Sequence, residues 1–202
     1  MTAQLRLLDL FCGMGGWSIG FYREGFECTG VDVVDVGYPY NLVLRDVREY
    51  HPEPGVYDVV VASPPCTEFS SITMLSWRKG QRGPPEPEKG MELVREAKRV
   101  IDEAKPRFWL LENVYGSIDH ISRLLGKPLV IAKPWILWGN IPIPLVVYPS
   151  GRDRNKGGNR VGLPEDFPFD PLRSWKRARI PIWLALQIAR NVAMIKRGDN
   201  HD

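Results

Sequence analysis

A cysteine and a glutamate, each following an apolar run, could together bond covalently to a substrate and give it a proton. Cys66 comes after Pro64 and Pro65, which end the preceding run and fix a rigid extended turn. That turn projects Cys66 from the carboxyl edge of a parallel sheet, and Glu112 can share this pocket if the two strands are neighbours. A thiol of lowered pKa is a nucleophile, and a carboxyl is a general acid. Most cysteines are instead small buried hydrophobic residues.

A glycine-rich turn after the first apolar run predicts a cofactor site. Gly13, Gly15 and Gly16 let a ligand approach the backbone closely. Asp32, at the end of the second predicted strand, is placed to accept hydrogen bonds from ribose hydroxyls. Ser18 stands where a dinucleotide fingerprint has its third glycine, and no Lys-Ser/Thr pair completes a phosphate-binding loop. The turn therefore indicates a cofactor that carries a nucleoside.

Alternating strands and helices must hold these groups, and their lengths predict a parallel α/β sheet. No periodic pattern covers residues 67–90, which are expected to form a loop. Trp135 and Trp138 are assigned to packing. Strands are expected at residues 5–11, 26–34, 41–50, 56–62, 107–112, 128–133 and 145–148, and helices after residue 13 and at 89–104, 117–125 and 181–196.

Three motifs in this order resemble the signature of the cytosine-C5 DNA methyltransferases. They are Phe11-Cys-Gly-Met-Gly-Gly, Pro64-Pro-Cys66 and Glu112-Asn-Val114. The similarity is thinner after about residue 115, where Ser150-Gly-Arg152-Asp-Arg154 is similar to the Gln-x-Arg-x-Arg element of the family. The resemblance implies a Rossmann-like, S-adenosylmethionine-dependent methyltransferase sheet with helices on both faces and a small Gly/Pro/basic lobe. It divides the chain into a catalytic core (1–148), a reduced target-recognition segment (149–179) and a closing helix packed on the core (180–202).

The resemblance also implies S-adenosylmethionine as the methyl donor, with no metal. Its methionine end would lie against the glycine turn, its ribose at Asp32, and its adenine between Val33 and Asp46. The residues expected at the cofactor are Asp9, Phe11, Cys12, Gly13, Met14, Gly15, Gly16, Trp17, Asp32, Val33, Asp46, Val47, Ser63 and Pro64.

By the same resemblance, Cys66 would attack C6 of cytosine, and Glu112 would hold N3 and supply its proton. Arg152 or Arg154 would hold the O2 side of the base. A paired cytosine must first leave the duplex, at a cost of about a few kcal/mol, and residues 67–90 are the expected clamp for the gap. The expected nucleic-acid contacts are Ser70, Trp77, Arg78, Lys79, Arg82, Asn113, Arg160 and Lys176.

Composition and charge agree with an intracellular nucleic-acid enzyme. Three scattered cysteines and three scattered histidines among 202 residues predict neither a disulfide framework nor a metal cluster. The whole chain has a net charge of +3, whereas residues 149–179 alone carry +4, which favours contact with a phosphate backbone over a merely solvated loop. We expect double-stranded DNA as the partner, no membrane anchor, a monomer, and a cytoplasmic location in a prokaryotic or viral setting.

Other functions stay open at this point. The same chemistry could act on RNA such as tRNA, or the fold could serve a non-catalytic nucleic-acid-binding accessory protein. An NAD-binding enzyme would explain the glycines and Asp32 but not the motifs at Cys66 and Glu112. Because residues 155–176 are few for target recognition, we expect a short or relaxed target site, in restriction–modification or in viral self-protection.

Overall fold

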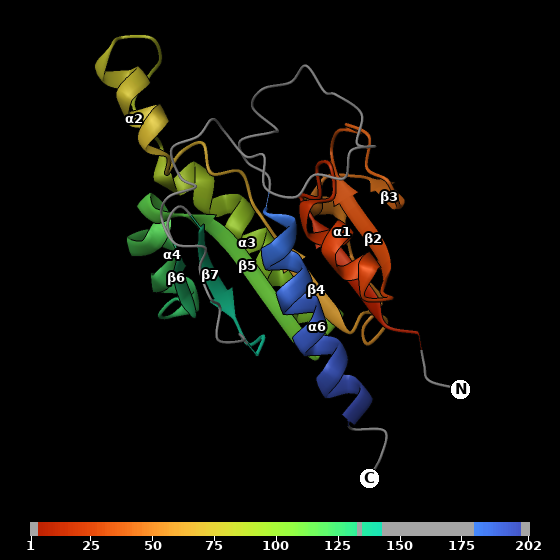
Figure 1. Ribbon diagram of the computed structural model, residues 1–202. Coiled ribbons are helices and arrows are strands. Elements are labelled where there is room, and N and C mark those ends of the chain that lie inside the picture. Colours follow the sequence, from red (N-terminus) through yellow and green to blue (C-terminus); the bar gives the residue numbers. More distant parts are fainter. Residues whose placement is uncertain (1–3, 133–134, 143–179, 199–202) are drawn as a thin grey trace.

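Seven strands form one sheet in the computed structural model, which describes residues 4–132, 135–142 and 180–198 (Figure 1). The sheet order is β3-β2-β1-β4-β5-β7-β6; β1 to β5 pair in parallel, and β7 is antiparallel to both β5 and β6. The chain order reverses between β1 and β4, which is where α/β sheets bind ligands. The predicted Rossmann-like α/β class is confirmed. The strands are β1 (Arg6–Leu10), β2 (Glu27–Asp32), β3 (Asn41–Leu44), β4 (Val59–Ala62), β5 (Phe108–Val114), β6 (Val130–Ala132) and β7 (Trp135–Gly139).

Helices cover both faces of the sheet because successive strand residues point to opposite sides. Leu7 of β1 belongs to one buried cluster, together with residues of α1 and α6, while Leu8 belongs to a second cluster with residues of α3 and α4. The sheet is therefore apolar on both sides. The described helices are α1 (Gly16–Arg23), α2 (Ser71–Arg78), α3 (Pro87–Ala104), α4 (Ile118–Leu125) and α6 (Ile182–Gly198), with short 3-10 turns η1 (Val47–Glu49) and η2 (Tyr115–Ser117).

The helix after the glycine turn, α1, packs directly against α6 from the end of the chain (Figure 1). A Cβ on Gly20 would lie 2.7 Å from the Ala185 carbonyl carbon, so the two helices approach at a distance that only glycine permits. Ile180 also lies close to α1, since a Cβ on Gly16 would lie 3.1 Å from its backbone nitrogen. The end of the chain thus supports the helix that follows the glycine turn.

We expect Gly20→Ala to lower the free energy of unfolding by about 1–3 kcal/mol, because the methyl group would push α1 and α6 apart. Alanine is otherwise the better helix former, so any loss of stability reports the contact itself. Denaturant unfolding measures the change, with Gly83→Ala as a control at a position that has no atom within 4 Å of a new Cβ. Equal or greater stability of Gly20→Ala would contradict the close contact.

Several element predictions differ from the structure. Residues 67–90 are not one loop: α2 occupies Ser71–Arg78, because no Gly or Pro interrupts residues 67–79, and α3 begins at Pro87 rather than at residue 89. The third strand ends at Leu44, because Asp46 caps η1. The run at Trp135–Gly139 is a strand, β7, that the sequence did not assign. The predicted strand at 145–148 and the segment 149–179 lie outside the described residues.

Candidate active site

The carboxyl ends of β1, β4 and β5 lie side by side at one edge of the sheet. Leu10 pairs with Ala62, and Ala62 pairs with Leu111, so the next residues of β4 and β5, Ser63 and Glu112, are level with each other. Ser63 forms a hydrogen bond with the Glu112 carboxyl group. The topology therefore holds Glu112 beside the chain that leaves β4.

The turn that carries Cys66 is fixed by hydrogen bonds on both sides of the cysteine. The side-chain amide of Asn113 donates to the Pro64 carbonyl oxygen at 3.0 Å, and the Phe69 N–H donates to the Cys66 carbonyl oxygen at 3.0 Å. Burial raises the pKa of the half-buried Cys66 thiol, and the charge of Glu112 raises it further. The Glu112 carboxylate is thus close enough to affect ionisation of the thiol, whose pKa is raised, whereas the sequence-based expectation of a nucleophile required a lowered pKa.

Phe69 anchors the same turn in a socket made by two glycines. A Cβ on Gly90 of α3 would lie 2.7 Å from the Phe69 ring, and one on Gly116 of η2 would overlap the Phe69 carbonyl oxygen. Phe69 is buried, and its ring centroid lies 5.7 Å from that of His120. This socket was not predicted from the sequence, because it depends on three segments that only the fold brings together.

The carboxyl group of Glu112 is buried, and its pKa lies near neutral pH. Burial raises its pKa to about 7, and the hydrogen bond from Ser63 acts in the opposite direction. Near neutral pH the group is therefore protonated in part, as a general acid must be. When Glu112 is protonated, it no longer carries the charge that raises the pKa of Cys66, and burial alone then opposes ionisation of the thiol.

The glycine turn after β1 has the strained backbone of a ligand-binding loop. Phe11, Gly13 and Gly15 have positive φ angles of 58, 50 and 77°. Such an angle is costly for phenylalanine and persists only where the surrounding structure enforces it. The Phe11 N–H does so here by donating to the Val31 carbonyl oxygen at 2.9 Å. The turn therefore adopts, at Gly13 and Gly15, the left-handed backbone conformation that favours glycine.

Asp32 joins this turn to the end of β2. The Gly13 N–H donates to Asp32 Oδ2 at 2.9 Å, and the Val34 N–H donates to Oδ1 at 3.2 Å. Each carboxylate oxygen keeps a lone pair for a further donor, such as a ribose hydroxyl. The next residue, Val33, is 59% exposed, an apolar surface on which a flat ring could pack. These residues therefore fit a nucleoside-bearing cofactor.

The glycine turn and Asp32 form a cradle, and some of the other predicted cofactor residues are buried behind it and support it. Asp9 is 1% exposed and accepts a hydrogen bond from Ser18 Oγ at 2.6 Å. Tyr38 Oη lies 2.7 Å from Ser18 Oγ. Trp17 is also buried, and its indole N–H donates to Ser63 Oγ at 3.0 Å, which links α1 to the strand end beside Glu112. The role of Tyr38 was not predicted, since nothing in the sequence relates it to Ser18. Cys12 and Val47 are buried as well.

We expect the free energy of unfolding to fall as pH rises from about 4 to about 7. Burial raises the pKa of Asp9 from 3.8 to about 7, so in this range the folded state holds a proton that the unfolded state has released. Glu112 acts with the same sign. Asp9→Asn should therefore remove roughly half of the slope in denaturant unfolding at pH 5 and pH 7.5. Asp102→Asn, an exposed carboxyl group on α3, is the control; an unchanged slope in Asp9→Asn would contradict the assignment.

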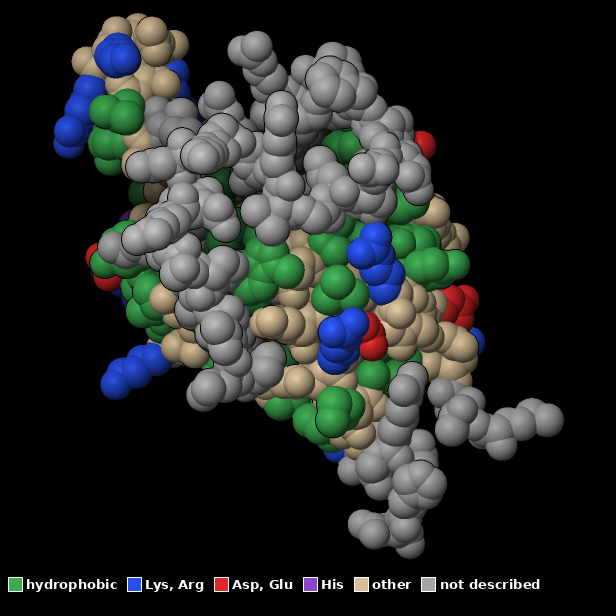
Figure 2. Space-filling view, viewed as in Figure 1, with side chains coloured by type: hydrophobic (Ala, Val, Ile, Leu, Met, Phe, Trp, Pro, Cys, Tyr) green, Lys and Arg blue, Asp and Glu red, His purple; other side chains and the backbone are tan. Residues whose placement is uncertain are grey.

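The predicted nucleic-acid contacts occupy different settings. Trp77, Arg78 and Lys79 are exposed at the end of α2, which projects from the body of the protein, and Figure 2 shows basic and hydrophobic side chains together on that tip. Arg82 forms an ion pair with Glu68 at 3.1 Å, so it also fixes the base of this projecting helix.

Ser70 precedes α2 and is partly buried. Asn113 is 1% exposed and holds Pro64, so contact with nucleic acid would require that bond to open. The remaining predicted residues, Arg152, Arg154, Arg160 and Lys176, lie outside the described residues.

Three further observations concern the described part of the chain. No group of three or more His, Cys, Asp or Glu side chains is arranged to hold a metal ion there, and no helix in residues 4–132, 135–142 and 180–198 has the length and hydropathy to cross a bilayer. A pocket of about 210 Å³ between α3 and α4 contains none of the predicted site residues. Its lining is Glu88, Met91, Arg95, His120, Arg123 and Leu124.

Fold and site together define an α/β protein with a glycine turn and Asp32 at the switch point, which fit a nucleoside-bearing cofactor, and a thiol and a carboxyl group next to them. Comparison with known proteins identifies the family: residues 5–127 match the profile of the C-5 cytosine-specific DNA methylases. The chain belongs to this family.

Curated relatives agree with the family. The Type II methyltransferase M.FnuDI of Fusobacterium nucleatum is 30% identical over 135 residues, which are 62% of this chain and 37% of the relative. A probable DNA (cytosine-5)-methyltransferase of Frog virus 3 is 31% identical over 115 residues, 54% of this chain and 53% of the relative. The Type II methyltransferase M.XorII of Xanthomonas oryzae pv. oryzae is 29% identical over 220 residues, 85% of this chain and 50% of the relative. The chain thus spans between about a third and about half the length of these relatives.

Proposed function

We propose that this chain is a DNA (cytosine-5-)-methyltransferase that transfers a methyl group from S-adenosylmethionine to C5 of a flipped-out cytosine. The observation that carries the proposal is the convergence of the Cys66 thiol and the buried Glu112 carboxyl group beside the glycine turn. Family membership supports the reaction class.

In this proposal the cradle holds S-adenosylmethionine, which supplies an electrophilic methyl group when bound. Asp32 would accept hydrogen bonds from the ribose, Val33 would pack on the adenine, and Asp46 would accept from the adenine amino group. The backbone of the turn at Gly13 and Gly15 would face the methionine end. Asp32 is already oriented by the N–H groups of Gly13 and Val34, so it needs little rearrangement to bind.

Cys66 and Glu112 then act together on the cytosine ring. The Cys66 thiolate bonds to C6 and pushes an electron pair toward C5, while Glu112 gives its proton to N3. C5 would then take the methyl group as its bond to the donor sulfur breaks, and S-adenosylhomocysteine would be the leaving product. Loss of the C5 proton to solvent then restores the C5–C6 double bond and expels Cys66 as thiolate, and N3 returns its proton to the Glu112 carboxylate. The hydrogen bond from Asn113 to Pro64 keeps the sulfur in place through both steps.

Double-stranded DNA is the proposed substrate, and the exposed Trp77, Arg78 and Lys79 at the tip of α2 suit it, because an aromatic ring can stack on bases and basic groups can meet phosphates. Arg152 and Arg154 stay predictions for the O2 side of the base, and residues 149–179 for target recognition. A short or relaxed target site and a monomeric enzyme are further predictions.

Covalent trapping tests the proposal. Fluorine at C5 cannot leave as a proton, so duplex DNA that contains 5-fluorocytosine should, with S-adenosylmethionine, form a protein–DNA adduct that survives denaturation. Peptide mapping should place the adduct at Cys66, and Cys66→Ser should give none. An adduct only with 5-fluorocytosine in tRNA would change the substrate to RNA. No adduct with either nucleic acid would overturn the proposal and favour a non-catalytic binding protein.

A further inference from the structure

The proposed adenine contact, Asp46, lies on a turn at the edge of the sheet. The Arg45 N–H donates to the Asp32 carbonyl oxygen at 2.8 Å, and β3 then ends. Asp46 caps η1 by accepting the Arg48 N–H at 2.9 Å, and the Arg48 guanidinium binds both of its carboxylate oxygens, at 3.0 Å from Nε and 2.6 Å from Nη2. The direction of the Asp46 carboxylate therefore follows the position of η1. No strand lies beyond β3 in the described sheet, so strand pairing does not fix this turn from outside.

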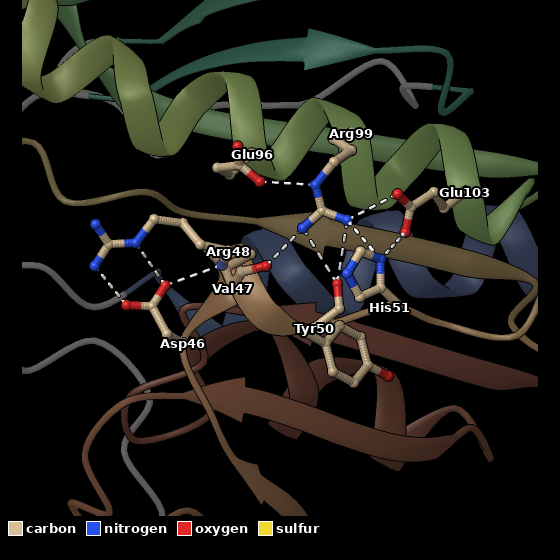
Figure 3. A network of polar contacts seen from close by, with 8 residues as sticks. All are labelled: Asp46, Val47, Arg48, Tyr50, His51, Glu96, Arg99 and Glu103. Carbon is tan, nitrogen blue, oxygen red and sulfur yellow. Dashed lines mark hydrogen bonds and ion pairs between the residues drawn. The ribbon is translucent and has the colours of Figure 1, made fainter.

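A side chain from α3 fixes the turn instead. Arg99 donates from Nη2 to the Val47 carbonyl oxygen at 2.8 Å and to the Tyr50 carbonyl oxygen at 3.2 Å, and from Nη1 to Tyr50 at 3.3 Å (Figure 3). Val47 and Tyr50 are the first residue of η1 and the residue after its last. The guanidinium thus holds both ends of η1 at once.

The Arg99 side chain is also held by acidic side chains of its own helix. Its Nε donates to Glu96 at 2.7 Å and its Nη1 to Glu103 at 2.8 Å, two carboxylates of the same helix (Figure 3). The ring of His51 lies 3.0 Å from Glu103 and 3.2 Å from Arg99. A planar group with five fixed donors can serve two carboxylates and two carbonyls together, whereas lysine offers a single point charge.

We propose that Arg99 is the positioning residue of the adenine end of the cofactor site, an inference that rests on the proposed function. It touches neither the cofactor nor the cytosine. It holds η1 so that Asp46 faces the adenine amino group, and it thereby sets the preference for a 6-amino over a 6-oxo purine. The cofactor-binding residues before β3 are independent of it.

The test compares two ligands by calorimetry: S-adenosylhomocysteine and S-inosylhomocysteine, in which a carbonyl oxygen replaces the adenine amino group. The wild-type protein should bind the adenine ligand at least about tenfold more tightly, because Asp46 would repel the carbonyl oxygen. Arg99→Met should weaken S-adenosylhomocysteine about tenfold and bring the ratio of the two affinities close to one. The methylation rate at saturating S-adenosylmethionine should change little, so the effect falls on KM rather than on kcat.

Arg95→Met is the matched control: Arg95 lies one turn earlier on α3 and pairs with Glu88 at 2.7 Å, so this variant should keep the wild-type ratio. The inference would be overturned if Arg99→Met kept the wild-type ratio of the two affinities, or if it weakened the binding of both ligands equally. If Arg99→Met does not fold, Arg99→Lys decides: a reduced ratio supports the inference, and an unchanged ratio overturns it. Failure of the wild-type protein to bind S-adenosylhomocysteine would instead overturn the proposed function.

Discussion

Cys66→Ser should reduce methyl transfer to DNA by at least about 10³-fold while leaving the fold and cofactor binding intact. A hydroxyl group has nearly the shape of the thiol, but it ionises far less readily and attacks C6 poorly. The hydrogen bonds that fix this turn come from Asn113 to Pro64 and from Phe69 to the Cys66 backbone, so they do not depend on the sulfur. Single-turnover transfer of a radiolabelled methyl group measures the loss, and calorimetry with S-adenosylhomocysteine measures binding.

Cys28→Ser makes the same substitution away from the sheet edge and is the control. Cys28 is buried in β2, where its thiol donates to the Ser18 carbonyl oxygen at 3.5 Å, a bond that a serine hydroxyl can replace. Its variant should keep wild-type transfer. Activity of Cys66→Ser above a few per cent of the wild-type rate would show that another group attacks the base.

Glu112→Gln should slow methyl transfer by about 10²–10⁴-fold, because glutamine can donate a hydrogen bond to N3 but cannot give it a proton. The pH profile distinguishes this loss from a change in binding. Ionisation of Cys66 raises the rate with pH, but because burial raises the pKa of Glu112 to about 7, loss of the Glu112 proton should cause a decline in the slope of the wild-type profile above that value. The variant should lack this decline.

The control for Glu112→Gln is Glu92→Gln, which changes an exposed carboxyl group on α3 and should keep both the rate and its pH profile. If Glu112→Gln retains the wild-type decline above pH 7, a different group supplies the proton.

The strand core was predictable because its residues follow simple physical rules. Short apolar runs predicted β1, β2, β4 and β5, and the rule that parallel strands present their carboxyl ends at one edge predicted that Cys66 and Glu112 would face one pocket. The register of Ala62 with Leu111 confirms that the two strands are neighbours.

Other features depend on contacts that local patterns do not encode. The apolar run of β7 suits a buried helix as well as a strand, and only its antiparallel pairing with β5 decides between them. The helix α2 has mixed exposure, with Thr73 buried and Leu75 and Trp77 exposed, so its pattern is weak. The links of Asn113 to Pro64 and of Arg99 to Val47 join residues about fifty positions apart, which no motif relates.

The packing of α6 on α1 has a consequence for how the chain folds during synthesis. Ala185 meets Gly20 across more than 160 positions, and α6 supplies about a third of the buried cluster on that face of the sheet. Until α6 has left the ribosome, Trp17, Phe21 and their neighbours have no cover. The nascent chain therefore exposes these apolar side chains until α6 is available to pack on them, and holding chaperones can bind them during that interval.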